Sequence, residues 1–222
     1  MIQTDFFGDV NLGLYAKSCD KFSILGNILR DYHKDFERTV ENKLCYLTLA
    51  NTDFIGIFSA LNSNGILVPK ILTEKEIKFL SDLKKDLKIN VGFVKTKFTA
   101  LGNLILCNDN GAVISKLIPK KEIRLIQDVL DVEIEYSKIA GLNTVGSCGI
   151  STNKGCVVHR DATESEIKII RDILKVDVNI GTVNFGSPFV GSGVVANSKG
   201  ALIGGTTTGP EITRVQEALG FL

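Results

Sequence analysis

The stretch Ala100–Ile114 reads Ala-Leu-Gly-Asn-Leu-Ile-Leu-Cys-Asn-Asp-Asn-Gly-Ala-Val-Ile, with two apolar runs on either side of the polar turn 108–111. Asn and Gly tolerate positive φ, so this pattern predicts a β-hairpin. A second glycine, Gly102, stands six residues before the first residue of the turn. The same combination of glycine, apolar run, polar turn and apolar run occurs elsewhere in the chain, and that recurrence decides the fold.

The repeat has a fixed period. Successive turn glycines are separated by 46, 44 and 45 residues, and each turn is preceded by another glycine in the same register. The turn glycines are Gly65, Gly111, Gly155 and Gly200, and the preceding glycines are Gly56, Gly102, Gly146 and Gly191. Periods of this length are typical of repeat architectures. A first, eroded copy is predicted around Lys21, with Gly13 one place away from the expected register.

Each copy continues with a helix and a third β-like run. The segments 73–76 and 163–166 read Thr-Glu-Lys-Glu and Thr-Glu-Ser-Glu, which are capping boxes that start helices. Segment 208–211 has the same form with a Pro in the first turn. The third runs are expected at 44–49, 89–94, 132–136 and 176–183. The unit is therefore strand, turn, strand, capped helix and strand.

Five such units predict an α/β fold, a five-fold pseudosymmetric α/β propeller of the pentein type. The repeats are expected at approximately 8–51, 52–96, 97–140, 141–184 and 185–222, within a single domain over 1–222. The fifth copy lacks its third strand, while residues 1–7 have no partner. Pairing the N-terminal strand with the last copy would close the ring and remove an exposed edge. An open solenoid, the rival architecture, would need polar caps at both ends.

Composition excludes several classes of protein. Hydrophobic residues make up 44% of the chain and charged residues 23%, which is ordinary for a globular domain with a core. The net charge of +1 gives no general basic surface for wrapping nucleic acid. No apolar run approaches the roughly 18 residues of a membrane helix, and no signal peptide is visible. The five cysteines form no Cys-x-x-Cys pair, so reduced thiols and a cytoplasmic location are expected.

A cysteine-dependent enzyme is the alternative to a binding protein. Guanidino-modifying hydrolases share the propeller architecture and use a nucleophilic Cys with a His. Cys148 or Cys156 could pair with His159 in space, although no carboxylate stands beside either cysteine to grip a guanidinium. Metal-ligand spacing is absent, so no metal site is predicted. We expect no enzyme.

Several motifs together resemble the translation initiation factor 6 family. They are Ala100-Leu101-Gly102-Asn103, Val145-Gly146-Ser147, Gly181-Thr182-Val183-Asn184 with Gly186-Ser187, and Thr207-Thr208-Gly209-Pro210-Glu211. The resemblance runs from about Leu12 to the C-terminus, and the archaeal branch is the closer match because the eukaryotic tail is missing. It implies a monomeric propeller that binds the large ribosomal subunit, blocks premature joining of the small subunit and takes part in large-subunit biogenesis. Contacts would run mainly to ribosomal proteins, with ribosomal RNA nearby, and neither catalysis nor a cofactor is implied.

The ribosome-binding face is expected where the chain enters each copy. The candidate contact residues are Gly102, Asn103, Ser147, Asn184, Ser187 and Ser192. Gly56, Gly146 and Gly191 are expected to be structural, because glycines let backbones approach closely at a crowded centre. The chain departs from the family at Ile57, where Arg is frequent, and at Thr206, where Asp is common.

Overall fold

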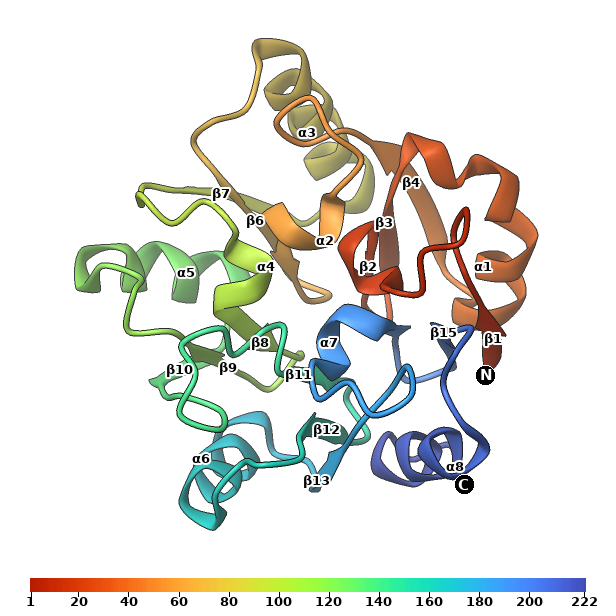
Figure 1. Ribbon diagram of the computed structural model, residues 1–222. Helices are drawn as coiled ribbons and strands as arrows, with labels where there is room; N and C mark the ends of the chain where they lie inside the picture. Colours follow the sequence, from red (N-terminus) through yellow and green to blue (C-terminus); the bar gives the residue numbers. More distant parts are fainter.

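A computed structural model describes residues 1–222 as five three-stranded sheets around a central axis, with the long helices on the outside (Figure 1). The five sheets are the blades of an α/β propeller, as the repeat predicts. No helix combines the length and the apolar content that crossing a membrane requires.

The second blade represents the architecture of all five. A one-turn helix, α2 (Ile55–Phe58), leads into strand β5 (Ala60–Leu61), which pairs antiparallel with β6 (Gly65–Pro69). Helix α3 (Glu74–Leu87) then crosses over to β7 (Asn90–Val94), which pairs parallel with β6. The parallel third strand needs this helical connection, because a tight turn can join only antiparallel strands.

The other blades repeat this order. The first contains η1 (Leu12–Leu14), β2 (Ala16–Ser18), β3 (Phe22–Gly26), η2 (Asn27–Tyr32), α1 (His33–Val40) and β4 (Lys43–Leu47). The third contains α4 (Leu101–Leu104), β8 (Ile105–Cys107), β9 (Gly111–Ile114), η3 (Lys120–Glu122), α5 (Ile123–Leu130) and β10 (Glu133–Tyr136). The fourth contains β11 (Gly149–Ser151), β12 (Cys156–His159), α6 (Glu164–Leu174) and β13 (Val178–Gly181). The fifth contains α7 (Val190–Gly193), β14 (Val194–Ala196), β15 (Ala201–Gly204) and α8 (Gly209–Ala218).

The fifth blade takes its third strand from the other end of the chain. Strand β1 (Ile2–Thr4) pairs parallel with β15, with Ile2 opposite Leu202. The side chain of Gln3 adds hydrogen bonds of 2.8 Å to the carbonyls of Gly205 and Thr207. The N-terminal strand therefore closes the ring where the sequence analysis expected it.

The first copy is in register, contrary to the expectation of a one-residue shift. In four blades the first turn residue donates its N–H to the carbonyl of the turn glycine, as in Asn62 to Gly65. In the first blade Cys19 donates in the same way to Phe22. Phe22, and not Lys21, thus occupies the turn-glycine position, and Gly13 then stands the same distance before Cys19 as Gly56 does before Asn62. The copy has lost its turn glycine but no residue.

Local signals set the helix starts. Thr73, Thr163 and Thr208 are N-caps of α3, α6 and α8, each in a complete capping box with the Glu three residues later. The third copy instead starts with the 3-10 turn η3 after Pro119. Proline has no backbone N–H, so Pro119 at the N-cap cannot donate the hydrogen bond that a capping box needs from this position.

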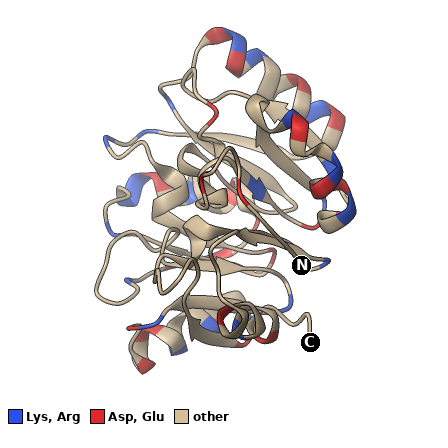
Figure 2. Cartoon of the chain, turned by 45° about the vertical axis from the view of Figure 1, so that its right-hand side comes forward, with Lys and Arg blue, Asp and Glu red and all other residues tan.

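The hydrophobic core is divided among the blade junctions. Five buried clusters each combine residues of two consecutive blades, and the last joins Val195 and Leu202 of the fifth blade to Leu12 and Leu25 of the first. Figure 2 shows charged residues mainly on the outer helices, with few on the strands near the axis. Every blade is thus held by both neighbours, which positions the loops at the two ends of the axis.

Candidate functional site

Five glycines form a closed ring at one end of the axis. A Cβ atom added to any of them would collide with the backbone carbonyl of a neighbouring ring glycine. The order of these contacts is Gly13, Gly56, Gly102, Gly146, Gly191 and again Gly13. Gly56 and its equivalents therefore allow five backbones to meet at the centre, a close approach that no other residue permits.

The residues on either side of each ring glycine have opposite environments. Each preceding residue is aliphatic and fully buried: Leu12, Ile55, Leu101, Val145 and Val190. Each following residue is half-exposed: Leu14, Ile57, Asn103, Ser147 and Ser192. The buried neighbour anchors the turn in the junction core, and the following side chain faces outward. We call the surface formed by these five entry loops the glycine face; it faces the viewer in Figure 1.

Tight turns on the glycine face are held by helix-capping carboxylates. Ala140 and Gly141 have φ of 54° and 72°, and both donate their N–H groups to Glu166 at 2.9 and 3.0 Å. Burial raises the pKa of Glu166, but backbone N–H groups including that of Gly141 donate to its charged form and together lower the pKa. Glu76 and Glu211 hold the equivalent turns, and their pKa values are lowered in the same way. The capping box thus also fixes the outer part of the face.

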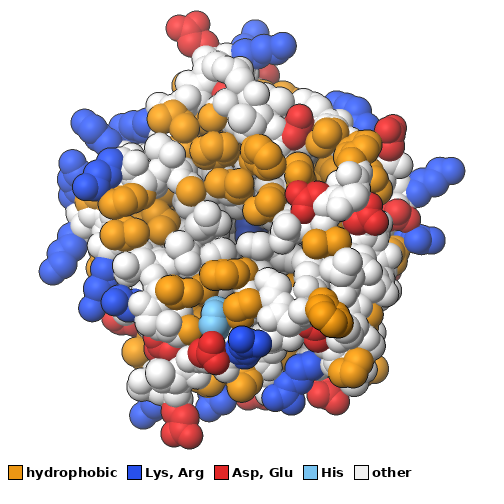
Figure 3. Space-filling model, viewed as in Figure 1, with side chains coloured by type: hydrophobic (Ala, Val, Ile, Leu, Met, Phe, Trp, Pro, Cys, Tyr) orange, Lys and Arg blue, Asp and Glu red, His pale blue; other side chains and the backbone are white.

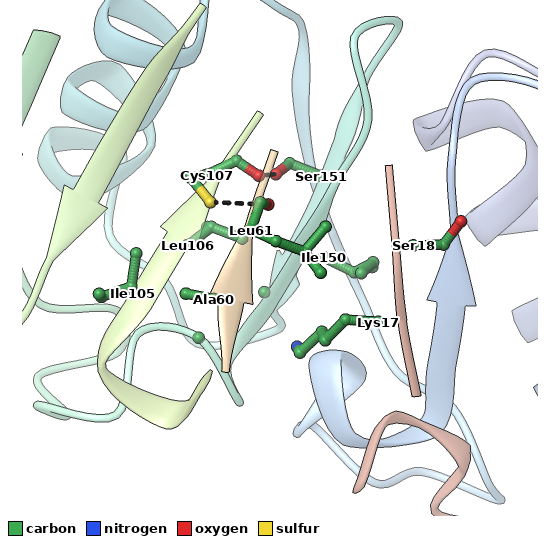
Figure 4. A pocket seen from close by; sticks show the side chains of 11 residues that line it. Lys17, Ser18, Ala60, Leu61, Ile105, Leu106, Cys107, Ile150 and Ser151 are labelled. Atoms are coloured by element: carbon green, nitrogen blue, oxygen red, sulfur yellow. Dashed lines mark hydrogen bonds between the residues drawn. The ribbon is translucent and has the colours of Figure 1, made fainter. Parts of the chain in front are cut away.

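A narrow cavity of about 40 Å³ lies on the axis next to the glycine ring. Figure 4 shows Lys17 pointing into it from β2, opposite Ala60. In the other blades the residue four places after the ring glycine is apolar, for example Leu106 and Ile150. Burial lowers the pKa of Lys17, whose ammonium forms no ion pair. The cavity has room for only a few water molecules, so it is not a pocket for an organic substrate.

A ring of polar side chains ties the hairpins together at the opposite end of the axis. The Asn153 amide donates to the carboxylates of Asp20 at 2.8 Å and Asp109 at 2.7 Å. Asp20 also accepts from the N–H of Ser198, and Asp109 accepts from the N–H and hydroxyl of Ser63. These bonds connect all five hairpin turns, so the polar residues of this end serve the ring itself.

The family is decided by a match along almost the whole chain. The model of the eIF-6 family matches residues 1–218. The chain belongs to the eIF-6 family.

Curated eIF-6 family relatives agree in length as well as in sequence. Translation initiation factor 6 of Saccharolobus solfataricus is 43% identical over 216 residues, which is 96% of both chains. The proteins of the same name from Pyrococcus furiosus and Thermococcus onnurineus are 42% and 38% identical over 221 residues, covering 98% of this chain and 97% of theirs. All three relatives are archaeal.

Asn103 has a side chain available for binding among the predicted contacts of this eIF-6 family protein. Its backbone carbonyl accepts a 2.9 Å hydrogen bond from the N–H of Gly146, whereas its half-buried side-chain amide bonds to no other residue. The Ser147 hydroxyl donates to the Thr144 carbonyl at 3.0 Å. Ser192 follows Gly191 with a free hydroxyl. The glycine ring thus brings the polar residues of three entry loops to the same face.

Asn184 has a different environment. It adopts a left-handed φ of 51°, and its amide donates to the Val10 carbonyl at 3.0 Å while accepting from the Thr207 hydroxyl at 3.1 Å. Ser187 closes the same turn through backbone hydrogen bonds with Val183. The Asn184 side chain is therefore engaged within the protein and supports the turn on which Ser187 lies.

In the eIF-6 family protein the N–H of His159 donates to the carbonyl of Cys148 at 2.7 Å, but no hydrogen bond joins the thiol of Cys148 or Cys156 to the imidazole. The Nδ1 atom of His159 accepts from the N–H of Asp161 at 3.1 Å, and its ring lies edge-on to Phe189. Burial raises the pKa of both Cys148 and Cys156, which disfavours the thiolate that a nucleophile needs. No group of three His, Cys, Asp or Glu side chains is arranged to bind a metal ion.

Two features of the eIF-6 family protein escaped the sequence analysis. One is Lys17, which could have been found by comparing the residue four places after each ring glycine. The other is the uneven charge of the glycine face (Figure 3). Comparing the charges of the five entry segments would have revealed it.

Proposed function

We propose that this protein is a translation initiation factor that binds the large ribosomal subunit and prevents premature association with the small subunit. The observation that carries the proposal is membership of the eIF-6 family, with full-length relatives named translation initiation factor 6. A role in large-subunit biogenesis is part of the same proposal.

The proposed mechanism is steric. The glycine face would bind the subunit, and the rest of the propeller would occupy space that the small subunit needs. A rigid face suits this role because ordering it on binding costs little entropy. The junction cores and the two axial rings provide such rigidity.

The proposed contact residues are Asn103, Ser147, Ser187 and Ser192. Gly102 would act by positioning Asn103 on the glycine face, and Asn184 would act by holding its turn. The contacts would run mainly to ribosomal proteins with ribosomal RNA nearby, and the protein would act as a cytoplasmic monomer without a cofactor. Catalysis is not part of the proposal, because neither thiol discussed above is paired with His159.

Sedimentation of purified archaeal subunits tests the proposal. The protein is added to separated large and small subunits under conditions that normally join them. We expect it to co-sediment with the large subunit alone and to reduce the peak of joined ribosomes. Co-sedimentation with the small subunit, or joining unaffected by saturating protein, would exclude the proposed function.

A further inference from the structure

The glycine face has an uneven distribution of charge. The entry segments of the first, second and fifth blades, 5–15, 48–58 and 182–193, contain no Lys or Arg. The third entry segment contains Lys95 and Lys97. In Figure 3, many Lys and Arg side chains lie along the left-hand rim and others lie at the right-hand rim and below the centre, while Asp and Glu lie among hydrophobic side chains to the right of the centre. The two sides of the face therefore suit partners of different chemistry.

Aromatic rings form a continuous network at the entry segments of the first and second blades, which contain no Lys or Arg. The ring centroids of Phe54 and Tyr15 are 5.3 Å apart, and the centroid of Tyr15 is 6.2 Å from that of the buried Phe6 ring. The ring centroids of Phe6 and Tyr32 are 4.9 Å apart, and those of Tyr32 and Phe7 are 5.4 Å apart. Phe7 and Phe54 are 59% and 38% exposed. Phe7 is also held at a φ of 56°, where a large side chain is rare, so its exposed ring is not explained by the needs of the turn.

Three carboxylates lie along this network. Asp5 accepts from the N–H of Gly8 at 2.8 Å, and Asp53 accepts from the N–H of Ile28 at 3.2 Å, each through one oxygen. Asp9 has both oxygens engaged, one with the Tyr15 hydroxyl at 2.9 Å and the other with the N–H and side-chain amide of Asn11 at 2.8 and 3.0 Å. None of the three forms an ion pair within the chain. We call the surface made by Phe7, Tyr15, Tyr32 and Phe54 with Asp5, Asp9 and Asp53 the acidic–aromatic arc.

We propose that the acidic–aromatic arc binds an arginine-containing protein segment. Guanidinium groups stack on aromatic faces and bind carboxylates through two parallel hydrogen bonds, so one residue type satisfies both components of the arc. Arg30, in the same η2 segment as Tyr32, already stacks on the ring of Tyr46, with its guanidinium carbon 4.7 Å from the ring centroid. A nucleic-acid backbone would instead place its negatively charged phosphates against three carboxylates that form no ion pair. This inference rests on the proposed function, because it names the partner chemistry of the face proposed to bind the large subunit.

Neutralising the arc tests its charge. In the double variant Asp5→Asn with Asp53→Asn, the amide oxygens can still accept from Gly8 and Ile28, so folding is preserved. We expect binding to large subunits to weaken about tenfold and to depend less on salt. The matched control is Asp82→Asn with Asp172→Asn, which makes the same charge change on the outer helices. Equal affinities for the arc variant and the control would overturn the inference.

Truncating one ring tests the aromatic component. Phe54→Ala should weaken binding about tenfold, because exposed aromatic anchors contribute most to such interfaces. Phe79→Ala is the control, since Phe79 is 42% exposed but lies on α3 outside the face. Thermal unfolding of each variant verifies that it is folded at the temperature of the binding measurement. Unchanged binding of Phe54→Ala would contradict the inference.

The class of partner is identified by photocrosslinking. A benzophenone amino acid replaces Phe7, and the complex with large subunits is irradiated. We expect a protease-sensitive adduct whose crosslinked peptide contains arginine; a ribonuclease-sensitive adduct would overturn the inference in favour of RNA. If the wild-type protein fails to bind large subunits, the proposed function fails. If it binds but the arc variants bind equally well, only this inference fails.

Discussion

The carbonyl oxygen of Gly56 occupies the space that a side chain at Gly102 would need. The same relationship holds at every step of the glycine ring, so no segment of the backbone can move away without displacing the next one.

Gly102→Ala should therefore destabilise the protein by several kcal/mol, because backbone atoms have to move to relieve the collision. Thermal or denaturant unfolding measures the loss. Gly209→Ala is the control, since nothing lies within 4 Å of a Cβ at that position. It should be neutral or slightly stabilising, as Ala is the better helix former. Similar stabilities for the two variants would contradict the role of the ring.

Deleting residues 1–7 should cost several kcal/mol of a typical total of about 5–15. The deletion removes β1 from β15 and takes Phe6, which is 1% exposed, out of the junction core. Removal of Leu222, which is 77% exposed, should leave the melting temperature unchanged. An unchanged melting temperature in the longer truncation would show that the ring is stable without its closing strand.

Acid should weaken the glycine face through its capping glutamates. The pKa of Glu166 is lower in the folded state, so the charged carboxylate stabilises the fold above its unfolded pKa, near 4.3. That stabilisation is lost as the pH falls through the folded pKa. Glu166→Gln should lower the free energy of unfolding by about 1 kcal/mol at neutral pH and flatten its decline below about pH 5. Glu164→Gln, in the same helical turn but outside the capping box, should leave that decline unchanged in a series of unfolding curves.

The cysteines should resist thiol reagents in the native protein. Burial raises the pKa of Cys19 and Cys107 to about 12, so little thiolate is present at neutral pH. Unfolding in guanidinium should expose all five thiols to stoichiometric modification. A single fast-reacting thiol in the native state, at Cys148 or Cys156, would revive the hydrolase alternative.

Asn103→Ala should separate binding from stability. The Asn103 side chain bonds to no other residue, so its removal should shift the melting temperature by only a few degrees. Under the proposed function, binding to large subunits should weaken. Thermal unfolding and co-sedimentation on one preparation provide the comparison. Early melting combined with normal binding of the folded fraction would make Asn103 a structural residue.

The repeat made most of the fold predictable. The register of Gly56, Gly102, Gly146 and Gly191 determines the blades, and the capping boxes determine three helix starts. The first blade was placed less well, because Phe22 occupies the turn-glycine position and concealed the register of Gly13. Aligning the copies on the turn glycine gives the wrong register for the first copy, because that copy has Phe22 in place of this glycine.

The candidate site was less predictable because its chemistry depends on which loops lie together. The sequence placed both Asn103 and Asn184 among the candidate contacts, but only the structure shows that Asn184 is held by Val10 and Thr207. The acidic–aromatic arc combines residues from separate segments, so no single motif reveals it. Lys17 is visible only when the inner strands are compared across all blades.

The pairing of β1 with β15 also determines when this protein can finish folding. Ile2 leaves the ribosome that synthesises it long before its partner Leu202 has been made. Until then β1 has no sheet to join, and the buried junction between the first and fifth blades cannot form. Blades one to four can assemble in the order of synthesis. The last junction must bring together the two most distant parts of the chain, and this step is slow because closing such a long loop costs entropy. Completion of the ring therefore comes last in this order, and a stalled, incomplete chain would expose an unpaired edge to its neighbours.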